Sequence, residues 1–375
     1  MTLRAGPLAG LRILEFAGIG PAPFCGRLFA DLGADVLRID RPGGYVYDRY
    51  SVDTRGRRSV IVDLKQSKAI DVALRLIRQA DALIEGFRPG VMERLGLGPE
   101  VALERNPKLV YARMTGFGQT GPLAGSPGHD INYTAISGAL HALGPKEKPT
   151  VPLNLIGDFG GGALWLAFGI MVALRHVADG GDGQVIDCAM TDGVISTMGM
   201  IYGAYAAGRW KDERESNIID GGAHFYNTYE CADGKWIAIG SIEKPFYLAL
   251  LEAMQIDDPA FSDPRIEDRW PELRERLGDI FATRTRDDWC ARFEGTEVCY
   301  APVLSLAEAP HHAHNEARGS FMSIDGVLQP APLPRFSRTP APPPRAAAPA
   351  GEGGAEALRD WGIDDAMIGS LVGSG

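Results

Sequence analysis

The first half of the chain alternates between short apolar runs and amphipathic segments, and this alternation restricts the possible folds more than any other feature. Apolar runs of this length are typical of buried strands, and the segments between them have the periodicity of helices. Such alternation predicts an α/β fold, in which a parallel sheet is covered by helices on both faces. The predicted strands are 11–18, 35–40, 81–87, 108–118 and 184–190, and the predicted helices are 21–34, 67–80, a short one near 91–96 and 161–177.

The residues that follow each predicted strand are the first candidates for a ligand site, because ligands bind parallel sheets beyond the carboxyl ends of the strands. These strand ends fall at 17–20, 40–42, 86–88 and 115–118. The helix at 161–177 is apolar on almost every side, so we expect it to be buried.

The second half has a different texture from about Phe225 onward. The segment NTYECADGKWIAIGS predicts two strands around an Asp-Gly turn, and helical stretches follow it, which indicates a small α+β domain. The Pro- and Ala-rich segment 329–354 predicts an extended connector, and a last helical segment is expected to dock on the large domain. The predicted organisation is a large domain at 1–200, a linker at 201–224, a small domain at 225–320, and a connector with a C-terminal helix at 321–375 that returns to the large domain.

Charge and cysteine content exclude several classes of protein. The formal net charge of −10 argues against a nucleic-acid-binding protein, which would carry a basic stripe. The five cysteines form no CxxC pair, so neither a zinc site nor a disulfide framework is predicted, and a cytoplasmic location is expected. Since the chain lacks a run of 18 apolar residues, we expect no membrane span.

The first strand–helix turn has the sequence GIGPAPFCG, which departs from the dinucleotide-binding pattern GxGxxG. Pro23 occupies the third glycine position, so an NAD site is not favoured. A simple tight turn and a turn that lines another nucleotide-like ligand both stay open.

Basic side chains gather near the predicted strand ends. Arginine binds phosphate through two parallel hydrogen bonds, so on an acidic chain this cluster favours a multiply phosphorylated small ligand over an idle solvated surface. The cluster consists of Arg38, Arg41, Arg55, Arg57, Arg58, Lys65, Arg88 and Arg94.

Three acids and one histidine are candidates for acid–base chemistry. His129 and Asp130 follow a glycine-rich loop, where such a pair is most often a satisfied polar pair or a loop cap. Asp158 precedes an apolar helix and could cap it, although free backbone N–H groups there could also hold a developing oxyanion. Glu243 begins a helix of the small domain and is either a solvated acid or, if that domain closes over His129, a group that orients the imidazole.

The motifs together resemble the family III CoA transferases, and within them the alpha-methylacyl-CoA racemase branch. The resemblance runs in order from about residue 7 to residue 340. It is carried by LAGLRILEFAG, FADLGADVLRIDRP, RGRRSVIVDLK, ALIEGFRPGVMERLGLG, YARMTGFGQTGP, GHDINY, NLIGDFGGG, GQVIDCAM and TYECADGKWIAIG.

This resemblance implies a Rossmann-like large domain and a small domain, with two chains interlocked as a dimer. The site would lie between the large domain of one chain and the small domain of the other. The residues implied to bind CoA are Arg41, Val62, Asp63, Leu64, Lys65, Gly86, Phe87, Arg88 and Arg94, and those implied to line the thioester are Gly128, Asp130, Ile131, Asn132 and Tyr133.

The resemblance also implies a mechanism. His129 would be the base for the S epimer and Asp158 the base for the R epimer of a 2-methylacyl-CoA, with Glu243 of the partner chain orienting His129. Backbone N–H groups near Asp158 would stabilise the enolate, and an apolar pocket would raise the pKa of Asp158. No metal or further cofactor is expected, because CoA is part of the substrate.

Two alternatives stay open. One is a CoA transferase of the same fold, in which Asp130 attacks the thioester. The other is a non-catalytic acyl-CoA-binding protein. The acyl group is also open, since a branched fatty chain, a sterol side chain or an aromatic acid would each suit the apolar residues near the site.

Overall fold

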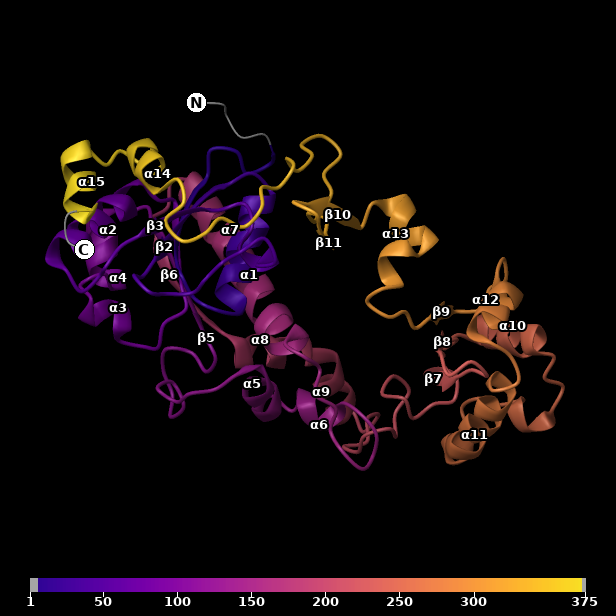
Figure 1. Ribbon diagram of the computed structural model, residues 1–375. Coiled ribbons are helices and arrows are strands. Elements are labelled where there is room, and N and C mark those ends of the chain that lie inside the picture. Colours follow the sequence, from indigo (N-terminus) through magenta and orange to yellow (C-terminus); the bar gives the residue numbers. More distant parts are fainter. Residues whose placement is uncertain (1–5, 373–375) are drawn as a thin grey trace. The chain divides into compact units, whose positions relative to one another are not determined.

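The computed structural model describes residues 6–372, and these divide into two compact units (Figure 1). The first unit comprises the chain up to Ser137, Pro152–Thr197 and the chain from Gly319 onward. The second unit comprises Gly138–Val151 and Met198–Arg318.

A six-stranded parallel sheet forms the centre of the first unit and confirms the α/β class predicted from the sequence. The strand order is β3-β2-β1-β4-β5-β6, so the order reverses between β1 and β4. Such a reversal is the place where open parallel sheets bind ligands. The strands are β1 (Arg12–Phe16), β2 (Asp35–Asp40), β3 (Arg58–Ile61), β4 (Ala82–Glu85), β5 (Val110–Thr115) and β6 (Gln184–Ala189).

Helices cover both faces of this sheet because successive strand residues point to opposite faces. One face, with Leu14 and Leu37, packs against α2 and the C-terminal helices, and the other, with Ile13 and Val36, packs against α1 and α7. The helices of this unit are α1 (Pro21–Asp31), η1 (Val52–Thr54), α2 (Ser67–Gln79), α3 (Val91–Arg94), α4 (Pro99–Arg105), α5 (Asp130–Ile136), the π-helix η2 (Leu155–Ala163), α7 (Leu164–Ala178), α8 (Met190–Thr197), α14 (Gly354–Asp360) and α15 (Asp365–Val372).

The apolar helix α7 is only partly buried, so the expectation of a buried helix at 161–177 is wrong. Leu166, Ile170 and Ala173 pack on the sheet, where α7 contacts β5 and β6. The opposite face of α7 is exposed although it is also apolar. The sequence therefore contains no polar side that would distinguish the exposed face from the buried one. The exposed residues are Leu164, Trp165, Phe168, Met171 and Val172. Within residues 6–372, Leu155–Ala178 is the one helical stretch with the length and hydropathy of a membrane span, and it forms part of this core.

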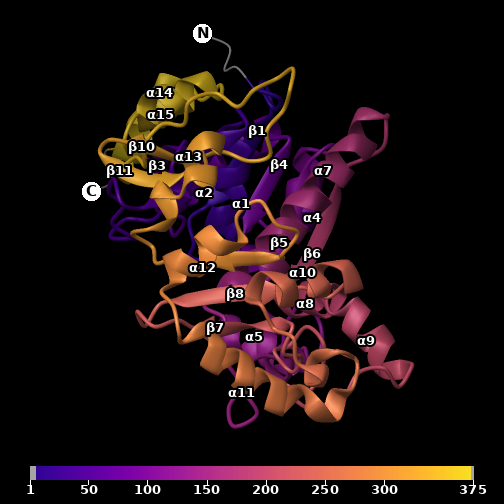
Figure 2. The same ribbon diagram turned by 90° about the vertical axis from the view of Figure 1, so that its right-hand side faces the viewer.

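The chain returns to the first unit through the hairpin β10 (Phe321–Ile324) and β11 (Val327–Pro330) and then through an extended strap. In the strap, the Arg345 carbonyl accepts a hydrogen bond from the Gly56 N–H at 3.0 Å. The Gly351 N–H donates to the Ser59 hydroxyl at 2.7 Å. The helices after the strap lie beside β3 and α2, as both views show (Figures 1 and 2), and Trp361 is fully buried there.

The second unit contains a three-stranded antiparallel sheet in the order β7-β8-β9. Its first hairpin turns at Asp233-Gly234, which confirms the hairpin predicted from the sequence, and Gly234 has a φ of 71°. The elements are α6 (Ala139–Ala142), α9 (Gly199–Ala206), β7 (Tyr226–Glu230), β8 (Trp236–Gly240), α10 (Lys244–Met254), η3 (Pro259–Phe261), η4 (Glu267–Arg269), α11 (Trp270–Phe281), α12 (Arg286–Phe293), β9 (Tyr300–Pro302), η5 (Ala309–His311) and α13 (Ala313–Arg318).

Segment 138–151 belongs to the second unit, although the sequence placed it in the large domain. The physical reason is the guanidinium group of Arg214, which donates to the carbonyls of His141, Pro145 and Lys146 at 3.0, 2.9 and 2.8 Å. Pattern reading along the chain does not reveal such a contact, because its partners are about 70 residues apart.

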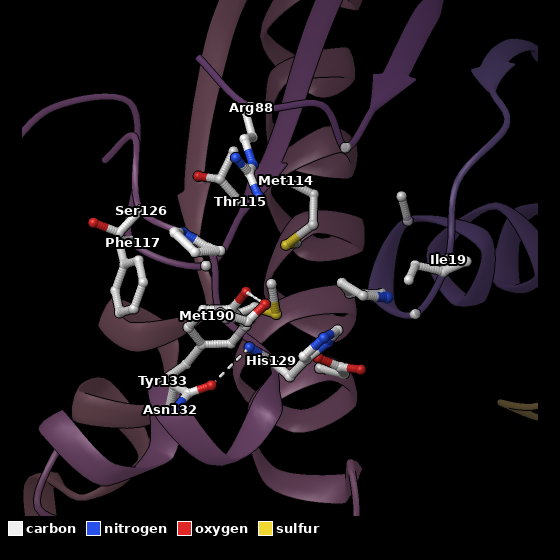
Figure 3. A pocket seen from close by; sticks show the side chains of 18 of the residues that line it. Ile19, Arg88, Met114, Thr115, Phe117, Ser126, His129, Asn132, Tyr133 and Met190 are labelled. Carbon is white, nitrogen blue, oxygen red and sulfur yellow. Dashed lines mark hydrogen bonds between the residues drawn. The ribbon is translucent and has the colours of Figure 1, made fainter. Parts of the chain in front are cut away.

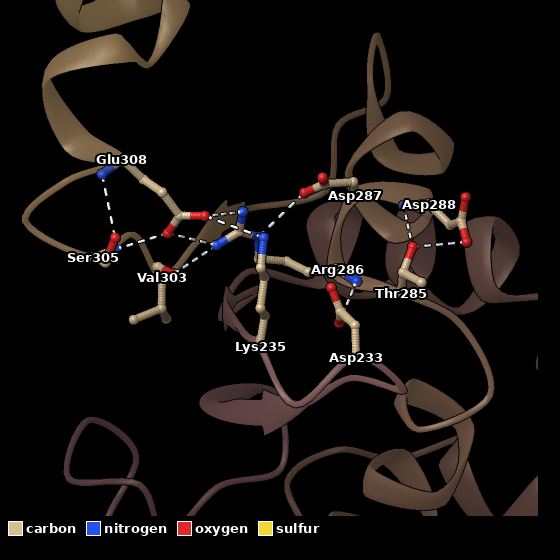
Figure 4. A network of polar contacts seen from close by, with 9 residues as sticks. All are labelled: Asp233, Lys235, Thr285, Arg286, Asp287, Asp288, Val303, Ser305 and Glu308. Atoms are coloured by element: carbon tan, nitrogen blue, oxygen red, sulfur yellow. Dashed lines mark hydrogen bonds and ion pairs between the residues drawn. The ribbon is translucent and has the colours of Figure 1, made fainter.

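An ion-pair network connects the turn before β8 and the start of α12 to the loop after β9 (Figure 4). Arg286 at the start of α12 donates to both carboxylate oxygens of Glu308, and Lys235 also pairs with Glu308. These hydrogen bonds hold the pKa of Glu308 far below its usual range.

Candidate active site

A cavity of about 680 Å³ opens at the carboxyl ends of β1, β4 and β5, next to the point where the strand order reverses (Figure 3). Its walls come from four parts of the first unit: the turn before α1, the turn after β4, the end of β5 with the following loop, and the start of η2. Figure 3 shows Arg88 near Met114 and Thr115, and His129 next to Asn132 and Tyr133. The lining residues include Gly20, Ala22, Gly86, Phe87, Arg88, Met114, Thr115, Phe117, Gly128, His129, Asn132, Tyr133, Asn154, Asp158 and Met190.

Asp158 lies inside the π-helix η2 and does not serve as a helix cap, because Asn154 occupies the N-cap position. The π-helix is possible because glycines let its backbone approach α8: a Cβ on Gly161 would lie 2.5 Å from the Val194 side chain. π-Helical turns are concentrated at functional sites. Gly20, with a φ of 70°, faces the Asp158 carboxyl, and a Cβ there would lie 3.0 Å from its Oδ2.

The carboxyl group of Asp158 has an unusual affinity for protons. Burial, followed by the negative charge of Asp130, raises the pKa of Asp158 to about 6, while a hydrogen bond from Asn154 and the nearby His129 act in the opposite direction. A carboxyl group with a pKa near 6 can both accept and donate a proton close to neutral pH.

His129 occupies the N-cap position of α5, and its exposed side chain lines the cavity. Its backbone N–H donates to the Asn132 side-chain oxygen at 3.0 Å, which fixes the first turn of the helix. Behind it, Tyr133 donates its hydroxyl hydrogen to the Gly128 carbonyl and packs against Gly116, where a Cβ would lie 2.0 Å from the tyrosine ring. The loop that carries His129 is therefore held from both sides.

Asp130 is buried with both carboxylate oxygens engaged. Its Oδ2 accepts a hydrogen bond from the Asp158 backbone N–H at 2.6 Å, and its Oδ1 accepts one from the Thr134 hydroxyl at 3.1 Å. The Phe159 N–H donates to the Asn154 carbonyl. The expectation that backbone N–H groups near Asp158 hold an oxyanion is therefore wrong for the N–H groups of residues 158 and 159.

The residues expected to bind CoA divide into two groups. Gly86, Phe87 and Arg88 line the cavity, whereas Arg41, Lys65 and Arg94 are exposed elsewhere and do not line it. Of the remaining expected residues, Val62 is buried and Leu64 packs on the core. The Asp63 carboxylate accepts a hydrogen bond from the Lys65 backbone N–H at 3.2 Å. Ile131 is exposed and does not line the cavity. Glu243 is exposed at the start of α10 in the second unit.

Four of the basic residues in the sequence cluster are not available for phosphate, which corrects that interpretation. Their guanidinium groups pair with acids inside the first unit, on β1, β2 and the end of α1, so they are already neutralised. The pairs are Arg38–Asp40 at 2.8 Å, Arg55–Asp31 at 2.7 Å, Arg57–Glu15 at 2.6 Å and Arg58–Asp35 at 2.6 Å.

Sequence reasoning missed two buried residues that support the cavity wall. Glu85 accepts a hydrogen bond from the Phe87 N–H at 2.7 Å, and Arg113 donates to Glu85 at 2.8 Å and to Glu93 at 2.7 Å. These bonds fix the turn that carries Arg88. Met114 and Met190 were also missed, although both end or follow a strand, which is the signal used for the other strand ends.

The fold and the cavity together define an α/β protein with a small-molecule site at the strand-order reversal, in which a histidine and a carboxyl group of raised pKa face one space. The sequence model of CoA-transferase family III matches residues 8–353, and the chain belongs to this family.

Similar proteins include racemases and transferases. The chain is 44% identical to "Alpha-methylacyl-CoA racemase" of Mus musculus over 96% of this chain and 95% of that protein, and 43% identical to the Homo sapiens protein of the same name over 90% and 88%. It is 32% identical to "Succinyl-CoA--L-malate CoA-transferase beta subunit" of Chloroflexus aurantiacus over 89% of each chain. The structure of a CAIB/BAIF family protein from Brucella suis superimposes with a TM-score of 0.83 at 26% identity, over 96% of this chain and 100% of that one.

Proposed function

We propose that the protein is an isomerase that interconverts the R and S epimers of 2-methylacyl-CoA thioesters. The observation that carries this proposal is that His129 and Asp158 line one cavity, although they lie on different elements. Epimerisation next to a thioester needs one group that removes a proton and a second group that delivers one to the opposite face. The identity to racemases named for this substrate supports the same reaction.

His129 removes the proton from the S epimer, and Asp158, in its protonated form, delivers one to the other face of the resulting enolate. The reverse reaction exchanges the roles, with Asp158 as base and a protonated His129 as acid. A pKa of about 6 for Asp158 suits both roles, since each form of the carboxyl is populated near neutral pH. The reaction as written needs no metal or redox cofactor, because acid and base groups suffice and CoA arrives with the substrate.

Arg88 is the cavity residue best suited to the phosphates or the pantetheine amides of CoA, because its exposed guanidinium group lies at the cavity wall. Arg41, Lys65 and Arg94 are exposed and follow the carboxyl ends of β2, β3 and β4, on the edge of the sheet where the cavity opens, so we propose that they add to the CoA-binding charge. On a chain with a net charge of −10, binding of a polyanion requires such a local cluster.

The active enzyme is proposed to be an interlocked homodimer in which Glu243 of one chain orients His129 of the other. The exposed apolar face of α7 supports a second copy as its cover, because five large apolar side chains on one helix face are unusual for a monomer. A cytoplasmic location is part of the proposal and is supported by the five cysteines, all of which are free thiols.

Exchange of the α-proton in deuterated water tests the reaction directly. With (R)- or (S)-2-methylacyl-CoA and no acceptor acid, the wild-type protein is expected to incorporate deuterium at C2 and to produce the other epimer. Substitution His129→Ala should slow epimerisation, and exchange of the S epimer, by about 10²- to 10⁴-fold, the usual contribution of a positioned acid or base. If the wild-type protein neither incorporates deuterium nor forms the other epimer, the proposal is refuted.

The transferase alternative predicts a different result when a free acid is supplied as acceptor. It requires Asp130 as a free nucleophile, whereas Asp130 is 7% exposed and both of its oxygens accept hydrogen bonds. Transfer of CoA to a free acid, with an adduct on Asp130 that hydroxylamine traps, would favour that alternative.

A further inference from the structure

We propose that Asp130 is a positioning residue, which holds Asp158 at the cavity that His129 also lines and whose charge controls the pH range in which Asp158 transfers protons. This inference rests on the proposed epimerisation and adds a residue to it. Asp130 does not touch the reacting carbon in this scheme. It acts through the two groups that do.

The connection between the two bases runs through the side chain of Asp130. Asp130 directly follows His129 and is the first residue of α5, and its Oδ2 accepts the Asp158 backbone N–H at 2.6 Å. One carboxylate therefore fastens the first turn of η2 to the first turn of α5, across 28 residues of sequence. The Thr134 hydroxyl, one turn further along α5, donates to Oδ1 and fixes the rotation of the carboxylate.

The backbone at this junction accepts only glycine beside Asp158. A Cβ on Gly157 would lie 2.6 Å from Oδ2 of Asp130, which is closer than atoms can approach. On the other side, a Cβ on Gly20 would lie 3.0 Å from Oδ2 of Asp158. Gly157 permits the close approach that the hydrogen bond between Asp130 and the Asp158 N–H requires, and Gly20 leaves room for the Asp158 carboxyl.

The charge of Asp130 also acts on Asp158. The ionisable groups that face Asp158 from α5 are Asp130, His129 and Tyr133, of which Asp130 favours the protonated form and His129 the ionised form. The turn before α1 presents Gly20 to Ala22 and α8 presents Met190, and these side chains carry no charge. Asp130 is thus the acid that opposes ionisation of Asp158.

Substitution Asp130→Asn separates the geometric role from the electrostatic one. The amide oxygen can still accept the Asp158 N–H, and the amide N–H₂ can donate to the Thr134 hydroxyl, so the spacing of the bases is kept. The negative charge is lost. With the R epimer, for which Asp158 is the base, the acidic limb of the kcat/KM profile is expected near pH 6 in the wild-type protein and about one unit lower in Asp130→Asn.

Substitution Asp130→Ala removes the hydrogen bond as well and should lower the exchange rate at every pH by about 100-fold, because misplacement of a base by about 1 Å has this effect. Asp187→Asn is the matched control: Asp187 also accepts backbone hydrogen bonds, from Gln119 at 3.0 and 3.2 Å, but it does not line the cavity. Its acidic limb should stay at the wild-type position.

The outcomes are distinct. If the wild-type protein epimerises the substrate but the acidic limb of Asp130→Asn stays at the wild-type pH, the inference about charge is overturned. If Asp130→Ala folds and keeps the wild-type exchange rate, the inference about position is overturned. A wild-type protein without exchange refutes the proposed function itself. Because Asp130→Asn keeps both hydrogen bonds, it tests the inference even if Asp130→Ala does not fold.

Discussion

At the scale of single residues, Asp158 illustrates how a site can reduce the stability of the protein that carries it. Its carboxyl is partly buried, and its pKa is raised from 3.8 to about 6. The folded state therefore binds the proton more tightly than the unfolded chain. The folded state gains stability as the pH falls from about 6 to about 4, and at neutral pH the buried charge destabilises the fold.

Substitution Asp158→Asn should consequently abolish function and stabilise the fold at once. A shift of about two pKa units corresponds to about 3 kcal/mol, so the variant is expected to be more stable than wild type by up to about 3 kcal/mol at pH 7. The gain should disappear near pH 4, where the wild-type carboxyl is protonated. Urea unfolding of both proteins at the two pH values measures this, and equal stabilities at pH 7 would contradict it. Deuterium exchange of the R epimer should fall by about 10²- to 10⁴-fold.

Two arginines of the sequence cluster have opposite roles, and a pair of variants distinguishes them. Arg57 is buried and donates to Glu15 at 2.6 Å and to the Asp53 carbonyl at 2.6 Å. Arg57→Met leaves the buried Glu15 unpaired and should reduce the free energy of unfolding by about 3–5 kcal/mol. Arg88→Ala should leave stability unchanged and raise KM for the CoA ester by about 10-fold, as expected for one lost charged hydrogen bond. Thermal unfolding and steady-state kinetics of both variants check the assignment, and an unchanged Tm for Arg57→Met would contradict it.

At the scale of elements, the sequence predicted five of the six strands of the sheet, because each has a long apolar run. It missed β3 as a strand of its own, since only four residues pair and they follow a run of arginines. The same run was interpreted as a phosphate cluster. Pairing of Arg57 with Glu15 joins residues 42 positions apart, and no local pattern encodes such a contact. Of the site, His129 and Asp158 were predicted through family resemblance, but the π-helix and the bonding partner of Asp130, the Asp158 backbone N–H, were not, because both depend on packing between elements.

The second unit contains a buried histidine that makes its stability sensitive to acid. His224 is fully buried, its Nε2 lies 2.9 Å from the Tyr247 hydroxyl, and burial lowers the pKa of His224 to about 4. As the pH falls below about 6.5, the unfolded chain takes up a proton before the folded unit does. The stability that the buried, neutral His224 contributes is thus fully present above pH 6.5. It is lost between pH 6.5 and about 4, and the total loss is about 3 kcal/mol.

Substitution His224→Gln should therefore reduce the amount of stability that the second unit loses between pH 7 and pH 4.5. Tryptophan fluorescence of Trp270 and Trp289, both buried in this unit, reports its unfolding in urea. His141→Gln is the control, since His141 is half exposed in the same unit and should leave the pH dependence as in wild type. A pH dependence in His224→Gln that equals the wild-type dependence would refute the assignment.

At the scale of the whole molecule, the proposed interlocked dimer would account for the exposed apolar face of α7 and would give Glu243 of the second unit a role at the site. A single chain leaves Leu164, Phe168 and Val172 exposed on one helix face. An interlocked dimer would cover this face and bring Glu243 of one chain to His129 of the other. The native mass should then be twice the chain mass of 40.3 kDa, and Phe168→Asp should lower both the dimer fraction and the exchange rate.

Complementation between two inactive variants tests whether the active sites are shared. His129→Ala and Glu243→Ala are each expected to be nearly inactive as homodimers. In a heterodimer of the two, one site receives both defects and the other receives intact His129 and intact Glu243. Co-expression with random pairing makes half of the dimers mixed, so about a quarter of the wild-type exchange activity should return. If His129 and Glu243 act within one chain, every site keeps one defect and no activity returns. Co-expression is required in place of mixing, because interlocked chains cannot exchange without unfolding.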